Sequence, residues 1–329
     1  MKAAVIDEFG ATPQYREVPD PEPGEGMQVA RVRAAAIKNI ERMLAAGDHY
    51  GSGGMSMPAQ VGLDAVVELT DGSRVYTGAT PPSGAMAEYL AVSASLSVPV
   101  PDEVDDATAA ALPNAAMSAW FSLEYAGKIK EGQTVLILGA TGVTGGLAVQ
   151  LAKHQFRAGH VVAAGRNEAR LAELAGQGAD EVIQLGRDEA ALAQFGGAIR
   201  QAHQRAPFDV VIDYLWGGPA EQVLGALANE DLQAQYQHTR FVQVGEMAGA
   251  TVQLPAAVLR SAGLEVVGQG AGSVPKEAFE RVLPEIMPTL LRMVADGTLK
   301  LRTRTRALAE VATAWREPAE SGLRTVLVP

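Results

Sequence analysis

The chain has 329 residues, of which 47% are hydrophobic and 20% are charged, and its formal net charge is −11. This length is ample for two globular domains, and the composition is ordinary for a folded protein. An acidic surface repels phosphate backbones, so the charge makes nucleic acid a poor partner. The chain has no cysteine, which excludes disulfides, thiol nucleophiles and cysteine-based zinc sites, and none of its five histidines has the spacing of a zinc site. We therefore expect no bound metal.

Neither a signal peptide nor a membrane span is predicted. Residues 1–7 lack the apolar stretch of a signal peptide, and no run of about 18 apolar residues occurs along the chain. These observations predict a cytoplasmic protein that does not enter a membrane.

The first third of the sequence has the pattern of a small β-barrel. Residues 29–37 alternate apolar with charged or small side chains, as a half-buried strand does. Three further ranges have a similar pattern: 61–69, 73–76 and 85–92. Asp71-Gly72 predicts a tight hairpin between two of them. Many short strands separated by frequent turns are typical of a barrel.

From residue 105 onward the pattern changes to that of an α/β domain. The range 105–125 has helical periodicity. Six short apolar runs then alternate with helical stretches, at 135–138, 161–164, 181–183, 209–213, 241–244 and 264–267. Such runs, when buried on both faces, predict a doubly wound parallel sheet. A helix over 276–296 and short strands near 299–305 and 325–328 follow, and we expect the last strand to rejoin the N-terminal domain.

A glycine-rich turn joins the apolar run 135–138 to the next helix. Its A-x-G-x-x-G core is Ala140, Gly142 and Gly145. In this motif the middle glycine lets the backbone approach a pyrophosphate, the last lets helix and strand pack closely, and the helix N-terminus offers free N–H groups. The strand before it and the strand after the helix are the context that a dinucleotide site requires. The alternative is a glycine-rich turn with no ligand. The residues predicted to contact the cofactor here are Ala140, Thr141, Gly142, Val143, Thr144 and Gly145.

The end of the following strand predicts which dinucleotide binds. NAD-binding units carry an acidic residue at this strand end, for the ribose 2′-hydroxyl. Here the chain reads Gly165-Arg166-Asn167. Without a carboxylate there is no repulsion toward a 2′-phosphate, and a guanidinium binds phosphate in a bidentate manner. NADPH is therefore the predicted cofactor, and the alternative is a solvated arginine at a helix start.

Six stretches form a specific combination in this order: MKAAV at 1–5, EVPDPEPG at 17–24, GAMAEY at 84–89, AALP at 110–113, EGQTVL at 131–136 and FDVVID at 208–213. Together they resemble the quinone oxidoreductase branch of the medium-chain dehydrogenases/reductases over essentially the whole chain. The resemblance implies an α/β fold with a GroES-like β-barrel catalytic domain built from both chain ends and a Rossmann doubly wound parallel sheet between them. The corresponding boundaries are 1–114 for the first part of the catalytic domain, 115–258 for the Rossmann NADP-binding domain, and 259–329 for the end of the Rossmann sheet and the return to the catalytic domain. It also implies a homodimer and a small-molecule substrate.

Zinc-dependent relatives carry a catalytic cysteine after the third strand and a G-H-E motif further on. In this chain Lys38 stands at the cysteine position, and the G-H-E position reads Gly62-Leu63-Asp64. The zinc ligands are replaced, so the resemblance implies a zinc-free enzyme. Many quinone oxidoreductases have asparagine where this chain has Lys38, so the chain departs from their pattern at this position. Short-chain dehydrogenases are excluded, because their Tyr-x-x-x-Lys pair is missing.

Three residues are candidates for the chemistry of hydride transfer, which leaves negative charge on a substrate oxygen. Lys38 stands where relatives bind a metal and would bring an ammonium to the cleft; the alternative is a surface lysine paired with Glu41. Tyr50 would donate a phenolic proton or shape the pocket, or else packs as a loop aromatic. Asp64 is expected to hydrogen-bond near the cleft, with general-acid catalysis as the lesser alternative.

The remaining predicted cofactor contacts follow from the resemblance and from the strand ends. The resemblance places Ser118 near the nicotinamide. Ligands of open α/β sheets bind beyond the carboxyl ends of the strands. The residues predicted there are Tyr214, Val244, Gly245, Glu246 and Gln269.

The sequence thus predicts an NADPH-dependent, metal-free reductase that transfers hydride to a quinone, an enone or a similar conjugated carbonyl. One alternative is an enoyl-thioester reductase, a reaction that this fold also hosts. The other is a non-enzymatic NADPH-binding sensor or structural protein, because the fold binds the cofactor without needing catalytic side chains.

Overall fold

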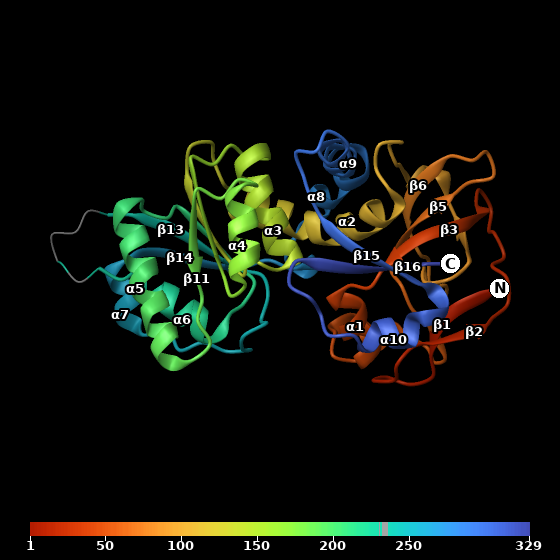
Figure 1. Ribbon diagram of the computed structural model, residues 1–329, viewed down its shortest axis with the longest axis horizontal. Helices are drawn as coiled ribbons and strands as arrows, with labels where there is room; N and C mark the ends of the chain where they lie inside the picture. Colours follow the sequence, from red (N-terminus) through yellow and green to blue (C-terminus); the bar gives the residue numbers. More distant parts are fainter. Residues whose placement is uncertain (230, 232–235) are drawn as a thin grey trace. The chain divides into compact units, whose positions relative to one another are not determined.

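The computed structural model describes residues 1–229, 231 and 236–329 and, within these, every side chain except that of Tyr50. The chain divides into two compact units. The first contains Met1–Asn114, Arg281–Gly297 and Leu301–Pro329, and the second contains Ala115–Glu280 and Thr298–Lys300. The first unit therefore combines the N-terminal third of the chain with its C-terminal end, which Figure 1 shows by the red and blue ribbons lying together.

The first unit contains two sheets (Figure 1). The smaller has the order β2 (Gln14–Glu17), β1 (Lys2–Ile6), β4 (Ala59–Gln60). The larger has the order β15 (Arg302–Ala307), β16 (Leu323–Val328), β3 (Gln28–Ala36), β5 (Asp64–Glu68), β6 (Arg74–Gly78), β8 (Val98–Pro99), with β7 (Tyr89–Val92) paired to β3. Its helices are α1 (Asn39–Ala46), α9 (Met287–Ala295) and α10 (Val311–Arg316). Strand β16 runs antiparallel to β3, so the predicted return of the C-terminal strand to the N-terminal domain is confirmed.

Strand β3 shows how the pattern of the sequence builds this unit. Ala30 and Val32 are buried in the core, whereas Arg31 is exposed, as the alternation predicts. Between Val32 and Ala34 the register with β5 shifts by a bulge, and beyond it three alanines in succession are buried. The bulge therefore brings the end of β3, which leads directly to Lys38, into the interior of the unit.

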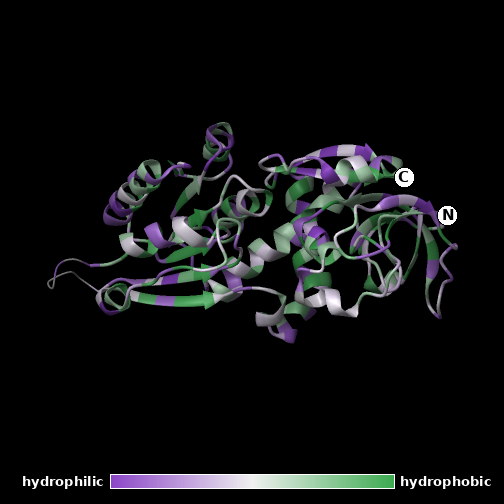
Figure 2. Cartoon of the chain, turned by 90° about the horizontal axis from the view of Figure 1, so that it is seen from below, coloured by the Kyte–Doolittle hydropathy of each residue, from purple (hydrophilic) through white to green (hydrophobic). Residues whose placement is uncertain are grey.

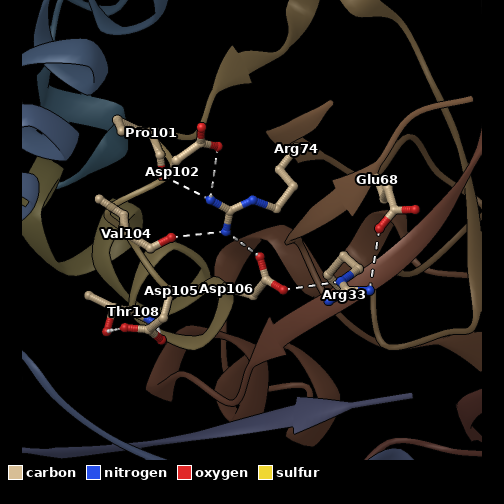
Figure 3. Close-up of polar contacts among 9 residues, drawn as sticks. All are labelled: Arg33, Glu68, Arg74, Pro101, Asp102, Val104, Asp105, Asp106 and Thr108. Carbon is tan, nitrogen blue, oxygen red and sulfur yellow. Dashed lines mark hydrogen bonds and ion pairs between the residues drawn. The ribbon is translucent and has the colours of Figure 1, made fainter. Parts of the chain in front are cut away.

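A charged network ties the start of helix α2 (Asp106–Phe121) to this sheet (Figure 3). The Asp106 carboxylate accepts from Arg33 on β3 at 3.1 Å and from Arg74 on β6 at 2.8 Å. Asp105 caps the helix by accepting from the backbone N–H of Thr108 at 2.9 Å. These bonds fix where α2 begins within the first unit.

The second unit is built on a six-stranded parallel sheet. Its order is β11 (Glu181–Gln184), β10 (His160–Gly165), β9 (Thr134–Leu138), β12 (Val210–Asp213), β13 (His238–Gln243), β14 (Gly263–Gly268). Its helices are α3 (Val143–Gln150), α4 (Glu168–Ala175), α5 (Glu189–Arg205), α6 (Gly217–Ala226), α7 (Ala256–Ser261) and α8 (Lys276–Glu280). The predicted doubly wound parallel sheet is confirmed, and Figure 2 shows its strands coloured largely as hydrophobic.

Three elements of the structure differ from the predicted ones: one strand, one helix and one helix that was not predicted. The predicted strand over 61–69 is interrupted at Gly62, where φ is +108° and an added Cβ would lie 2.5 Å from the backbone nitrogen of Met86. The predicted helix 276–296 is divided into α8, a π-helical turn (Val282–Ile286) and α9. The long helix α5 was not anticipated. Among the described residues, no helix combines the length and the apolar character needed to cross a membrane.

Candidate functional site

Two glycines of the glycine-rich turn are required by the fold itself. Gly139 has φ of +89°, and the backbone N–H groups of Gly139 and Ala140 both donate to the carbonyl of Ala164 at 2.9 Å. At Gly145, an added Cβ would lie 2.3 Å from the carbonyl oxygen of Gly139. Helix α3 therefore packs against the end of β9 as closely as the motif predicts.

Gly142 is different, because nothing in the protein demands a glycine there. Its φ of −73° is open to any residue, and an added Cβ would lie 3.4 Å from the carbonyl oxygen of Gly139, an ordinary contact. Gly142 is also the N-cap of α3, and no side chain caps that helix. The missing side chain leaves the N–H groups and the positive dipole end of α3 open to an anion.

The end of β10 is built without room for an acidic side chain. A Cβ at Gly165 would lie 2.5 Å from Cγ2 of Thr141, so the turn packs directly on this strand end. Arg166 is exposed and makes no hydrogen bond or ion pair within the described part of the chain. Asn167 caps α4, because its side chain accepts from the backbone N–H of Arg170 at 3.1 Å. Of this predicted group, Arg166 is the residue whose polar atoms remain available for a phosphate.

Arg170 is a second guanidinium near this edge, which the sequence analysis missed. It is buried, forms an ion pair with Glu173, and approaches the backbone of α3 at Gly146. Its position four residues after Arg166, inside helix α4, was the available signal in the sequence.

The predicted residues at the carboxyl ends of the later strands are joined through Ser122, which was not predicted. Its hydroxyl interacts with the carbonyl oxygen of Ser118 at 2.6 Å and with Oε1 of Gln269 at 2.9 Å. Burial raises the pKa of Tyr214, and the nearby hydroxyl of Ser122 opposes that shift. Ser118, Tyr214 and Gln269 are thus brought together in the second unit.

The ends of β12 and β13 also meet closely. The N–H groups of Val244 and Gly245 donate to the backbone oxygen of Asp213 at 2.8 and 3.2 Å. A Cβ at Gly245 would lie 2.6 Å from the carbonyl oxygen of Tyr214, so this position requires glycine. Glu246 is exposed and lies beyond this close contact.

In the first unit, Lys38 lies at the centre of a buried charged cluster rather than on the surface. Its side chain is 1% exposed, and its Nζ lies 2.5 Å from Oδ1 of Asp64 and 3.1 Å from Oε1 of Glu41. Glu41 also accepts from the backbone N–H groups of Lys38 at 2.7 Å and Leu63 at 3.1 Å. The alternative of a surface lysine is wrong, although the pairing with Glu41 that it included is present. The buried end of β3 leads directly to Lys38 and places this residue inside the unit.

The electrostatics of this cluster favour a charged lysine. Burial lowers the pKa of Lys38, but Asp64 and Glu41 together outweigh it and raise that pKa above its ordinary value. Burial and the Asp64 carboxylate raise the pKa of Glu41 against the opposing effect of Lys38. Burial and a hydrogen bond with Asp64 raise the pKa of Tyr76, so its phenol stays protonated. The cluster is a fixed ammonium held by carboxylates.

Arg324 and Tyr76 also lie near the charged cluster of Lys38, Glu41 and Asp64. Arg324 donates to the carbonyl oxygen of Ile37 at 3.3 Å, and burial lowers its pKa while Glu41 and Asp64 act in the opposite direction. Arg324 and Tyr76 were not predicted, since they lie far from Lys38 in the sequence. Tyr50 begins a short 3₁₀ helix (Tyr50–Gly54), and its side chain lies outside the described part of the structure. Within the described residues, no cluster of side chains suitable for a metal ion occurs.

Comparison with known proteins finds a quinone reductase and a polyketide synthase among the relatives of this chain. No family model matches the chain. The Probable NADPH-dependent quinone reductase tdiC of Emericella nidulans is 26% identical, over 100% of both chains. The Mycocerosic acid synthase-like polyketide synthase of Mycobacterium tuberculosis is 29% identical over 89% of this chain, which spans 14% of that protein.

Among solved structures, the quinone oxidoreductase from Thermus thermophilus, which was also determined as a complex with NADPH, matches with a TM-score of 0.78. It is 25% identical, and the match covers 100% of both chains. The fold inferred from the sequence, a Rossmann sheet with a GroES-like domain built from both chain ends, is thereby confirmed. The resemblance to the quinone oxidoreductase-like medium-chain dehydrogenases/reductases is confirmed as well.

Proposed function

We propose that this chain is an NADPH-dependent reductase that transfers hydride to a quinone, an enone or a similar conjugated carbonyl without a metal. The observation that carries the proposal is Gly142, whose glycine the fold does not need and whose missing side chain opens the uncapped N-terminus of α3. A phosphate group is the ligand that such a helix end suits. The names of the full-length relative tdiC and of the Thermus structure support the same cofactor.

The residues around this turn fit NADPH in particular. The backbone of residues 140–145 would hold the pyrophosphate, and Arg166, exposed and unpaired within the described chain, would bind the 2′-phosphate. Ser118, Tyr214 and Gln269, with the backbone of residues 244–246, would line the nicotinamide end. When bound, NADPH supplies the hydride; the protein supplies binding and electrostatics.

For the substrate, the chain offers a cation where zinc-dependent relatives hold a metal. We assign Lys38 the role of stabilising negative charge that develops on the substrate oxygen, with Asp64 and Glu41 holding its ammonium in place. Tyr50 remains the candidate for donating a proton or shaping the pocket. The homodimer and the cytoplasmic location stay predictions. We assign the dimer to the outer edge of β14, which pairs with no further strand among the described residues and on which Val266 is exposed.

The second candidate function is reduction of enoyl thioesters. The similarity to a polyketide synthase over 89% of this chain favours it, although the chain spans only 14% of that protein. A large acyl carrier is acidic and needs a basic entry surface, whereas this chain carries a net charge of −11. Quinone or enone reduction is therefore the preferred reading.

Cofactor titration and turnover on one sample separate the alternatives. Fluorescence titration with NADPH and NADH comes first, followed by 9,10-phenanthrenequinone, an enone and an enoyl thioester as acceptors. The proposal requires tighter binding of NADPH than of NADH, and faster oxidation with the quinone or enone than with the thioester. Faster turnover of the thioester would establish the second candidate instead. Binding with no turnover of any acceptor would favour a sensor, and no binding of NADPH would end the proposal.

A further inference from the structure

A buried carboxylate lies beside the cofactor turn and has no part in the function as proposed. Asp213 is the last residue of β12 and is 0% exposed. It pairs in register with Leu138 at the end of β9 and with Gln243 at the end of β13. From β9 the chain proceeds through β10 and β11 on one side and returns to β12 on the other. Asp213 therefore sits at the point where the strand order reverses, which is where ligands of such sheets bind.

Asp213 holds the segment that follows it through both carboxylate oxygens. Oδ1 accepts from the backbone N–H of Leu215 at 2.8 Å and of Trp216 at 3.1 Å, and Oδ2 accepts from Trp216 at 3.2 Å. Its backbone oxygen meanwhile accepts from the N–H groups of Val244 and Gly245. Asp213 thus fixes residues 214–216 and residues 244–245, and both segments contain predicted cofactor contacts.

The segment held in this way is strained and forms the wall of the glycine-rich turn. Trp216 has φ of +56° and ψ of −162°, a conformation that residues with side chains rarely adopt. Such a conformation persists only when its surroundings impose it, and the bonds from Asp213 supply the constraint. At Gly139, an added Cβ would lie 3.2 Å from the side chains of both Leu215 and Tyr214. A shift of residues 214–216 would therefore move the side chains against which the glycine-rich turn packs at Gly139.

We propose that Asp213 is a positioning residue of the cofactor site, whose ionised carboxylate holds residues 214–216 against the glycine-rich turn and so sets the affinity for NADPH. This inference rests on the proposed function. It assigns to Asp213 a role in cofactor binding without contact between its side chain and the cofactor.

The ionisation of Asp213 supports this role. Burial raises its pKa to about 6, against the opposing effect of the N–H groups of Leu215 and Trp216. On the neighbouring strands, the residues beside Asp213 are Leu138 and Gln243, and the titratable residue next to it along the chain is Tyr214. Among the described residues, no charged side chain contributes to the raised pKa of Asp213. At neutral pH the carboxylate is ionised and accepts all of these bonds. Below about pH 6 it takes up a proton, and its grip on the segment weakens.

The test compares Asp213→Asn with Asp209→Asn, at the two ends of the same strand. Asp209 precedes β12 and accepts from the backbone N–H of Thr134 at 2.8 Å, so its variant also loses a carboxylate that binds backbone. The dissociation constant for NADPH is measured by fluorescence for wild type and both variants at pH 7.5 and 5.5. The 2′-phosphate of NADPH itself titrates near pH 6, so variants are compared with wild type at each pH.

We expect Asp213→Asn to bind NADPH about tenfold more weakly than wild type at pH 7.5, and to differ much less from wild type at pH 5.5. Asp209→Asn should follow wild type at both values. Equal binding by wild type and Asp213→Asn at pH 7.5, or an equal loss in both variants, would overturn the inference while leaving the proposed function intact. If wild type does not bind NADPH, the proposed function fails and the inference fails with it.

Asp213→Glu serves if the asparagine variant does not fold. It keeps the charge but displaces the carboxylate by one methylene, so it should weaken NADPH binding and retain the pH dependence of wild type. Wild-type affinity in this variant would contradict the positioning role.

Discussion

Replacing Lys38 by methionine tests the buried cluster most directly. Methionine fills a similar volume but leaves the carboxylates of Glu41 and Asp64 buried without the cation that lies 3.1 and 2.5 Å from them. Removing one partner of a buried ion pair generally costs about 3–5 kcal/mol of stability, because the remaining charge is uncompensated. Two carboxylates lose their partner here, so we expect a loss at the upper end of that range at pH 8.

The pH dependence of this loss follows from the direction of the pKa of Glu41. Burial already raises that pKa in the presence of Lys38, which acts to lower it, so removing Lys38 raises it further. A carboxyl group whose folded-state pKa lies above the unfolded value binds more protons in the folded state, and stability then falls as pH rises through the folded-state pKa. The loss caused by Lys38→Met should therefore be smaller at pH 5.5 than at pH 8.

Urea denaturation of wild type and Lys38→Met at the two pH values measures both effects. Adding Glu41→Gln in the Lys38→Met background should restore part of the stability at pH 8, because it removes one of the two uncompensated charges. Turnover of the folded variant should fall about 100-fold, the scale for loss of an electrostatic stabiliser of developing charge, with the dissociation constant for NADPH unchanged. Wild-type stability at pH 8 would refute the buried ion pair, and wild-type turnover would reduce Lys38 to a structural residue.

Three further substitutions test the cofactor site and the assembly. Arg166→Ala should raise the dissociation constant for NADPH by about 10–100-fold, the value of a charged hydrogen bond of about 1.5–3 kcal/mol, and leave that for NADH nearly unchanged; equal effects on both titrations would remove its role at the 2′-phosphate. Gly142→Ala should unfold at the same urea concentration as wild type yet lose NADPH affinity, and wild-type affinity in this variant would contradict phosphate binding at the N-terminus of α3. Gly145→Ala should instead be destabilised, because its Cβ would lie 2.3 Å from the carbonyl oxygen of Gly139. Val266→Lys on the exposed edge strand β14 should yield a monomer in analytical ultracentrifugation, while Val182→Lys on the opposite edge strand β11 should not; a monomeric wild type would contradict the predicted dimer.

The parallel sheet was predictable because its signal is local. Each strand is a short apolar run. The runs 135–138 and 161–164 are buried along their whole length and form strands β9 and β10, as the sequence predicts. The barrel was less predictable, because its strand ends depend on contacts between distant segments. Strand β5 begins at Asp64 rather than at residue 61, because Gly62 approaches Met86 closely, and no local pattern predicts that contact.

The candidate site divides in the same way. The glycine-rich turn is one contiguous stretch, and Arg166 follows it at the spacing of about 20 residues that such sites have, so both could be found from the sequence. Ser122, which joins Ser118 to Gln269, and Arg324, which lies near Lys38, are brought to their sites by folding. A buried lysine is equally hard to foresee, because lysine is almost never fully buried unless it is paired, and the Asp64 partner is 26 residues away.

The geometry around Lys38 also limits how it can replace a metal. A catalytic zinc keeps an open position at which substrate or water binds directly. A lysine ammonium has three N–H donors, and Asp64 and Glu41 already lie within 3.1 Å of Nζ. At most one donor is then left for a substrate oxygen, so Lys38 can bind one developing charge but cannot polarise two oxygens or activate a water beside the substrate. Acceptors with a single oxygen at which charge develops during hydride transfer, such as enones, therefore suit this cluster better than reactions that need a metal-bound hydroxide.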